Sequence, residues 1–118
     1  MAQAADTERV LQHIRTLGLD ALVVIGGDGS MHIAHGLAQR GVPVVGVPKT
    51  IDNDIVGCEQ SFGFDTAVHT ATEALEKLQT TGQSHSRVMI LETMGRYAGW
   101  IALHAGLAGA ADVIVLPE

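Results

Sequence analysis

The apolar run at residues 21–25 is the feature that most restricts how this chain can fold. It reads Ala-Leu-Val-Val-Ile without a polar interruption, has the length of a strand rather than of a helix, and is closed by two glycines. Such a run is typical of a strand that is covered on both faces within a parallel sheet. A similar run at residues 42–47 follows after a segment of helix length. The pair therefore predicts an α/β fold with an open parallel sheet, flanking helices and right-handed connections.

Further elements follow from the spacing of the other apolar residues. The pattern predicts helices at residues 7–17, 30–40, 65–80 and 98–107, and two more strands at residues 87–92 and 113–116. These elements alternate as in a Rossmann-like three-layer sandwich with about four strands. Because the chain has 118 residues, we expect a single α/β domain over residues 1–118.

Charge and cysteine content exclude several classes of protein. Seven Lys and Arg against thirteen Asp and Glu give a net charge of −6, so the basic surface that binds nucleic acid or anionic membranes is missing. No apolar run approaches the roughly 20 residues of a membrane span. The single cysteine, Cys58, fits a reducing compartment. We therefore expect a cytoplasmic protein with no nucleic-acid partner and no membrane partner.

The loop after the first predicted strand carries the first candidate site. Residues 26–30 read Gly-Gly-Asp-Gly-Ser, in which the glycines let a phosphate approach the backbone and the following helix start favours negative charge. Asp28 is an oxygen ligand of the kind that magnesium binds. The loop matches neither the dinucleotide-binding fingerprint nor the P-loop. From the glycine pattern alone, a nucleotide-phosphate loop and a plain strand-to-helix turn remain equal interpretations.

The aperiodic stretch at residues 48–64 carries a second candidate, Thr-Ile-Asp-Asn-Asp at residues 50–54. Long loops in compact domains are usually functional or disordered. An extended backbone would direct Asp52 and Asp54 to one side, where two carboxylates could act as a general base or share a metal. The plainer alternative is an Asx-type turn with solvated acids, and the segment alone favours that turn.

The third candidate loop, Met94-Gly95-Arg96, follows the predicted strand at residues 87–92. Gly95 admits a ligand beside the backbone and Arg96 offers a guanidinium fork to a phosphate, although a surface arginine beside a turn is the alternative. Arg87 lies at the other end of that strand, so both arginines serve one ligand only with a neighbouring subunit. Because ligands bind at the carboxyl ends of parallel strands, we expect the three loops to line one crevice.

Together, these motifs resemble the phosphofructokinase family in order and spacing. The resembling segments are Gly-Gly-Asp-Gly-Ser, Pro-Lys-Thr-Ile-Asp-Asn-Asp and Met-Gly-Arg-Tyr-Ala-Gly-Trp, with Gly-Phe-Asp-Thr-Ala, Ser-His-x-Arg and the final Leu-Pro-Glu between and after them. The resemblance implies a phosphofructokinase-type fold and a glycolytic 6-phosphofructokinase activity. In that reaction the terminal phosphoryl group of ATP passes, with Mg²⁺, to the 1-hydroxyl of fructose 6-phosphate, giving fructose 1,6-bisphosphate. It also implies a homo-oligomer for the full-length protein.

The resemblance implies a role for each matching residue. Asp52 corresponds to the catalytic base, with Thr50 and Asp54 as supporting residues, and Asp28 corresponds to the magnesium-associated aspartate. The residues that correspond to the donor-binding group are Gly27, Asp28, Gly29, Ser30 and Lys49. Those that correspond to the sugar-phosphate group are Thr50, Ile51, Asp52, Arg87, Met94, Gly95 and Arg96, and in the family the Arg87 position reaches a neighbouring subunit's substrate.

Three alternatives remain beside the ATP-dependent reading. Family members that use pyrophosphate usually carry Asp where this chain has Gly29 and Lys where it has Lys49, so the two positions point to different donors. The loop at residues 26–30 alone also resembles those of NAD kinases and diacylglycerol kinases, but the segment at residues 50–54 argues against them. Because the family's first strand and most of its sugar-phosphate domain would lie outside these residues, we expect an internal fragment, which leaves a non-catalytic nucleotide- or partner-binding role as the third alternative.

We predict that Gly29→Asp weakens the use of ATP more than the use of pyrophosphate. A carboxylate at position 29 would repel the inner phosphate of a nucleotide, whereas glycine leaves room for it. The measurement is kcat/KM with each donor, made on a full-length protein that carries this segment. Equal losses with the two donors would contradict the argument.

Overall fold

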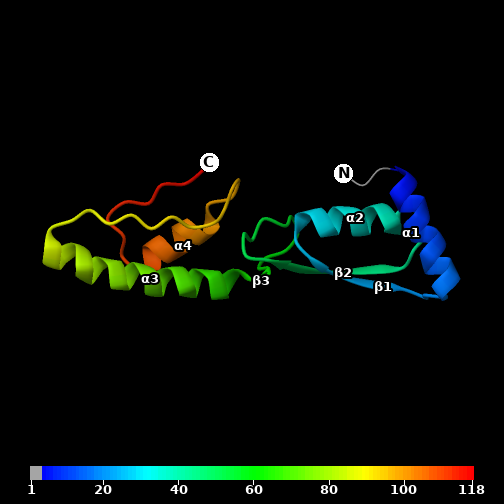
Figure 1. The fold of residues 1–118 in the computed structure, drawn as a ribbon, viewed down its shortest axis with the longest axis horizontal. Helices are drawn as coiled ribbons and strands as arrows, with labels where there is room; N and C mark the ends of the chain where they lie inside the picture. The colour runs from blue at the N-terminus through cyan, green and yellow to red at the C-terminus, as the bar shows by residue number, and fades with distance from the viewer. Residues whose placement is uncertain (1–3) are drawn as a thin grey trace. The chain divides into compact units, whose positions relative to one another are not determined.

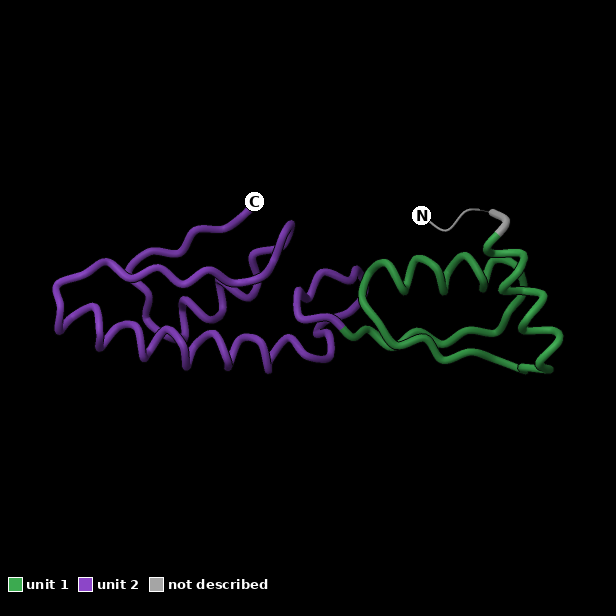
Figure 2. The backbone as a smooth tube through the Cα atoms, in the orientation of Figure 1, with its two compact units in different colours: residues 1–49 green, residues 50–118 purple. Residues whose placement is uncertain are grey.

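A computed structural model describes residues 4–118, and its helices and strands are labelled in Figure 1. In chain order they are α1 (Ala4–Leu17), β1 (Leu22–Gly26), α2 (Asp28–Ala38), β2 (Val44–Thr50), β3 (Phe62–Gly63), α3 (Phe64–His85) and α4 (Trp100–Ala108). The chain divides into two compact units, residues 1–49 and residues 50–118, which Figure 2 shows in two colours. The single domain over residues 1–118 stays a prediction.

The first unit is built on the two predicted buried strands. β1 and β2 are parallel, with register from Leu22 opposite Val44 to Gly26 opposite Pro48. Helix α2 runs along one face of this pair, as Figure 1 shows, and Met31 lies so close to Gly46 that a Cβ there would be 2.7 Å from its sulfur. The structure therefore confirms the α/β class and the parallel pairing.

The other face of the strand pair differs from the prediction. Val23, Ile25 and Val45 point away from α2 and are 61–67% exposed. An unbroken apolar strand predicts that both of its faces are covered, yet in the described residues of the first unit only the face toward α2 is covered. The apolar pattern records what a side chain prefers to contact, and it does not say which segment supplies that contact.

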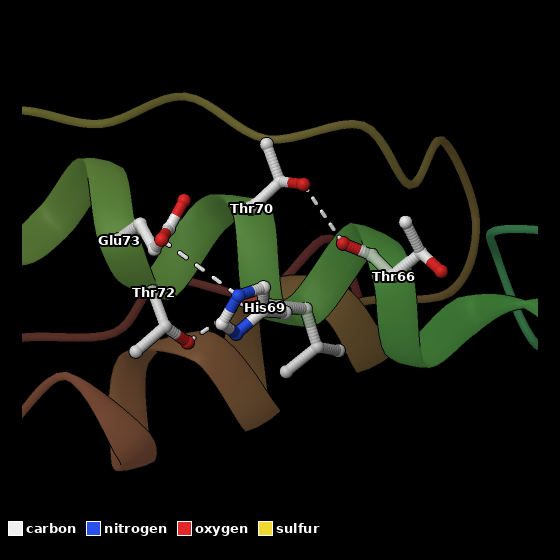
Figure 3. Close-up of polar contacts among 6 residues, drawn as sticks. Thr66, His69, Thr70, Thr72 and Glu73 are labelled. Atoms are coloured by element: carbon white, nitrogen blue, oxygen red, sulfur yellow. Dashed lines mark hydrogen bonds and ion pairs between the residues drawn. The ribbon is translucent and has the colours of Figure 1, made fainter.

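The second unit is organised around the long helix α3, against which α4 packs. Threonine hydroxyls of α3 donate to carbonyls one turn back, and His69 lies 3.7 Å from Glu73 (Figure 3). The amide of Gln79 donates to the Ala110 carbonyl at 3.0 Å, which fixes the chain just after α4. Gly109 lets the Leu75 side chain approach, since a Cβ there would be 2.6 Å from it.

The prediction of strands at residues 87–92 and 113–116 is wrong, because the described structure has no strand in either range. A strand requires a ladder of hydrogen bonds to a neighbouring strand, whereas the Arg87 N–H bonds to the Gly82 carbonyl at 3.0 Å. Both segments instead run beside helices (Figure 1): Met89 lies near Gly82 of α3, and Ile114 lies against Gly106 of α4. The alternation of side chains is present, with Val88 exposed and Leu91 half-buried, but strand partners are not.

Other differences are a short third strand, three helices that begin early, an α3 that runs beyond its predicted end, and an α4 that begins after its predicted start. β3 was not predicted, and it makes the strand order of the sheet β1-β2-β3, so the described strands are three rather than about four. Helices α1, α2 and α3 begin before their predicted starts, α3 directly after the left-handed Gly63. Of the helices in residues 4–118, none is both long and apolar enough to cross a membrane.

Two helix glycines give a matched test of this packing. A Cβ at Gly106 would lie 2.7 Å from the Ile114 side chain, whereas at Gly36 its nearest neighbour would be the end of Arg40 at 3.8 Å. We expect Gly106→Ala to lower the free energy of unfolding by about 1–3 kcal/mol through overpacking. Gly36→Ala should instead raise it by about 0.5–1 kcal/mol, since alanine is the better helix former.

Urea unfolding followed by helical circular dichroism measures both changes. A stabilising Gly106→Ala would show that the segment at residues 113–116 does not pack on α4 as described.

Candidate functional site

The loop at residues 26–30 joins β1 directly to α2. Gly27 is the extended N-cap of α2, with φ −85° and ψ −165°, and no side chain caps the helix. The first backbone N–H groups of α2 are therefore without a capping side chain, and such groups together with the helix dipole favour an anion. Asp28 and Gly29 are exposed, and a Cβ at Gly29 would meet nothing within 4 Å. Ser30, the first residue of the helix predicted at residues 30–40, lies within the first turn of α2, where its hydroxyl fills the space beside Gly26 that a Cβ would need.

The loop after β2 is held by Ser61, which is 3% exposed. The Ser61 hydroxyl donates to the Thr50 carbonyl at 2.8 Å, and the Ser61 N–H donates to Oδ1 of Asn53 at 2.8 Å. The Ser61 carbonyl accepts the Phe64 N–H at 3.3 Å, next to the start of α3. One buried serine thus ties the end of β2, the loop and the start of α3 together.

Asn53 bends the loop between the two predicted carboxylates. Its φ of 53° is left-handed, so the extended backbone, one of the two interpretations of residues 50–54, does not hold at this position. Asn is among the few residues that adopt this region readily, because its short polar side chain makes local hydrogen bonds. As a result Asp52 is half-buried while Asp54 is exposed, and the structure does not show the two carboxylates sharing an environment.

Asp52 is the chemically unusual member of the loop. Its N–H donates to the Thr50 hydroxyl at 3.2 Å, but its side-chain Oδ1 is buried and has no hydrogen-bond partner. Among the side chains that the structure describes, this is the one buried oxygen or nitrogen atom without a partner. Leaving a buried polar atom unpaired costs about 1–3 kcal/mol, so such atoms call for a functional explanation. The solvated-acid alternative fits Asp54 and does not fit Asp52.

The third loop is shaped by Gly95. Its φ of 130° is unfavourable for other residues, and a Cβ there would collide with the Ala98 carbonyl oxygen. The following Arg96 places its guanidinium carbon 4.9 Å from the centre of the Tyr97 ring, in cation–π contact, and both residues are exposed. The Arg96 side chain is therefore supported on one side and open to an anion on the other.

Arg87 lies far from the Asp52 loop within the same unit. It follows the C-terminal end of α3, whereas the Asp52 loop adjoins the N-terminal end at Phe64. A helix rises about 1.5 Å per residue, so the length of α3 separates these two ends by about 33 Å. The structure therefore separates Arg87 from Asp52, whereas the predicted separation of Arg87 from Arg96 stays a prediction.

Two hollows flank the start of α4 in the second unit. One, of about 330 Å³, is lined by Met94 and Gly95 together with Gly99 and Val115. The other, of about 480 Å³, is lined by Asn53 and by residues that were not predicted as site residues, namely Cys58, Glu59, Gln60, Phe64, Asp65, Trp100 and His104. The structure thus brings Thr50, Asp52 and Asn53 together, while Arg87 lies at the other end of α3. The single crevice stays a prediction.

Ser61 is the residue that sequence patterns do not reveal. A serine within an aperiodic loop has no periodic partner, and its importance comes from burial and from a contact eleven positions away. Lys49, by contrast, is exposed at the end of β2, as a charged residue beside a phosphate site would be. In the part of the chain that the structure describes, no cluster of three or more His, Cys, Asp or Glu side chains is placed to hold a metal.

Comparisons with known proteins show which proteins this chain is similar to in sequence and in fold. The sequence pattern described as Phosphofructokinase matches residues 1–118. The chain is 56% identical, over all its residues, to the ATP-dependent 6-phosphofructokinase of Chloroflexus aurantiacus, and 56% identical over 111 residues to the pyrophosphate–fructose 6-phosphate 1-phosphotransferase of Amycolatopsis methanolica. It spans about a third of the length of these curated relatives. The T-state crystal structure of Pichia pastoris phosphofructokinase superposes with a TM-score of 0.88 at 28% identity, covering 98% of this chain and 13% of that one.

Substitutions at Asn53 separate the effect of its left-handed backbone from the effect of its hydrogen bond with Ser61. We expect Asn53→Ala to lower the free energy of unfolding by about 2–4 kcal/mol, because it strains a left-handed residue and leaves the Ser61 N–H unpaired. Asn53→Gly loses the same hydrogen bond without the strain and should cost about 1–2 kcal/mol less. Urea unfolding of the two variants is the measurement, and equal losses would show that the left-handed conformation is unimportant.

Proposed function

The chain belongs to the phosphofructokinase family, and from that membership we propose that it carries the phosphoryl-transfer loops of an ATP-dependent 6-phosphofructokinase. The full reaction moves the terminal phosphoryl group of ATP to the 1-hydroxyl of fructose 6-phosphate. The name of the Chloroflexus aurantiacus relative supports this proposal. Since the chain spans about a third of that relative, the remaining walls of the substrate site would come from other parts of a full-length protein.

The buried, unpartnered oxygen of Asp52 carries the proposal. The Asp52 side chain is half-buried rather than enclosed, and a substrate hydroxyl that reached its carboxylate would supply the hydrogen bond that Oδ1 lacks. In the reaction that hydroxyl loses its proton as its oxygen attacks the terminal phosphorus of ATP, and the bond from that phosphorus to ADP breaks. Asp52 would receive this proton as the general base. The hydroxyl of Thr50, which accepts the Asp52 N–H, supports the loop from the preceding position.

The loop at residues 26–30 would bind the phosphoryl donor. The uncapped N-terminus of α2 suits phosphate oxygens, Gly29 leaves open space, and the exposed Lys49 adds positive charge. Mg²⁺ is usually held by one or two carboxylates together with substrate phosphates, so the single exposed carboxylate of Asp28 fits such a site. When bound, the ion would neutralise charge on the donor phosphates.

The sugar phosphate would be bound by the loop at residues 94–96, by residues beside the base, and by Arg87. The exposed guanidinium of Arg96, with Met94 and Gly95 beside it, offers two parallel hydrogen bonds to a phosphate, and Ile51 lies next to the base. Arg87 stands about one helix length from Asp52, which supports a role in the site of a neighbouring subunit and hence a homo-oligomer of the full-length protein. The free thiol of Cys58 fits a cytoplasmic setting.

Pyrophosphate is the second candidate donor. It is favoured by the name of the Amycolatopsis methanolica relative, which is as similar to this chain as the ATP-dependent ones. The open space at Gly29 argues for ATP, because a Cβ there would meet no atom within 4 Å. The same openness makes Gly29→Asp a clean test of the donor, since the substitution creates no clash with the protein itself.

We predict that Asp52→Asn lowers kcat by about 10²–10⁴-fold with little change in KM, because the amide retains the shape of the carboxylate but cannot act as the base. The assay is phosphorylation of fructose 6-phosphate by a chimaera in which residues 1–118 replace the matching third of the Chloroflexus aurantiacus relative.

Asp20→Asn makes the same chemical change at an exposed position away from the loops and serves as the control. An unaltered kcat in Asp52→Asn would remove Asp52 from the role of base. A chimaera that binds nucleotide but forms no product would favour a non-catalytic, nucleotide-binding role instead.

A further inference from the structure

We propose that Ser61 is a positioning residue for the carboxylate of Asp52, a role that rests on the proposed function. Ser61 forms hydrogen bonds through its hydroxyl, its N–H and its carbonyl, and it is almost wholly buried. Two of these bonds reach the chain on either side of Asp52, at the Thr50 carbonyl and at the Asn53 side chain. Ser61 thereby fixes both ends of the short segment that carries the carboxylate.

Asp52 depends on such fixing because Oδ1 makes no hydrogen bond of its own. The backbone N–H of Asp52 donates a hydrogen bond to Oγ1 of Thr50 at 3.2 Å, whereas Oδ1 of its side chain has no partner. A side-chain oxygen without a partner takes its direction from the backbone and from its rotamer. The position of the carboxylate therefore depends on the backbone of residues 50–53 together with the Asp52 rotamer.

The conformation of Asn53 links that backbone to Ser61. Asn53 has a φ of 53°, and its Oδ1 accepts the Ser61 N–H at 2.8 Å, with the Ser61 hydroxyl also at 3.3 Å. Asparagine tolerates the left-handed region but does not require it, so the bond to Ser61 selects the bend. Without the Ser61 hydroxyl, the Thr50 carbonyl loses its anchor and the segment is free to shift.

The same geometry separates positioning from catalysis. Ser61 is buried, and its hydroxyl, N–H and carbonyl all form hydrogen bonds with other protein groups. It would act on the reaction only through Asp52. A shift of about 1 Å in a catalytic group lowers a rate on the order of 10²-fold, which is the size of effect that loss of the hydroxyl should have.

A double-mutant cycle in the active chimaera tests this role. We expect Ser61→Ala to lower kcat on the order of 10²-fold at unchanged KM for both substrates, and Ser61→Thr, which keeps the hydroxyl, to restore kcat to within about threefold of the parent. In the Asp52→Asn background, Ser61→Ala should cause no further loss, because there is no longer a base to misplace. A loss of the same fold in both backgrounds would overturn the proposal.

Two controls keep the outcome clear. Thr72→Val removes a hydroxyl that donates to the Val68 carbonyl at 2.9 Å within α3 (Figure 3) and should leave kcat unchanged. If Ser61→Ala unfolds below the assay temperature, Ser61→Cys takes its place, because a thiol has a similar shape but is a weaker hydrogen-bond donor. A normal kcat in a folded Ser61→Cys variant would count against the proposal. An inactive parent chimaera would contradict the proposed function itself, whereas an active parent with a normal Ser61→Ala would contradict the positioning role alone.

Discussion

The buried hydroxyl of Ser61 is the interaction on which the geometry of the second unit's loop depends. It anchors the carbonyl of Thr50, the last residue of β2, while the amide of the same serine holds Asn53. A buried hydroxyl needs a hydrogen-bond partner, so the loop can close in few ways. The carbonyl of Ser61 continues the network to Phe64, whose buried ring meets His104 of α4 edge-on at 5.2 Å.

This network explains how a loop of polar residues can present one carboxylate oxygen without a partner. The loop forms its bonds through Thr50, Asn53 and Ser61, and their combined stabilisation offsets the cost of leaving Oδ1 of Asp52 unpaired. Strain and unsatisfied groups of this kind persist where the surrounding structure determines the conformation, and they gather at functional sites. A base fixed before substrate arrives loses little conformational freedom in the reaction.

Local sequence signals predicted much of the fold and only part of the site. The runs at residues 21–25 and 42–47 predicted β1 and β2 because branched apolar residues and closing glycines act locally. The strands expected at residues 87–92 and 113–116 failed because pairing depends on a distant partner, which alternation does not reveal. Asp52 could be singled out from its motif, whereas the bend at Asn53 and the role of Ser61 depend on a contact across eight residues of loop. The single crevice, the donor and the subunit contacts depend on arrangements that no local pattern encodes.

The hydrogen bonds of Ser61 imply that the protein holds the Asp52 loop in place before any ligand binds. Amide hydrogen exchange of Ser61, followed by NMR in the absence of ligands, tests it most directly, since that N–H is donated to Oδ1 of Asn53. We expect the Ser61 amide to exchange slowly, at a rate comparable to the amides of α3 and much lower than that of the exposed Val56. Exchange of the Ser61 amide at the rate of an unprotected loop would contradict the claim, because the loop would then be formed by its ligands rather than by the buried serine.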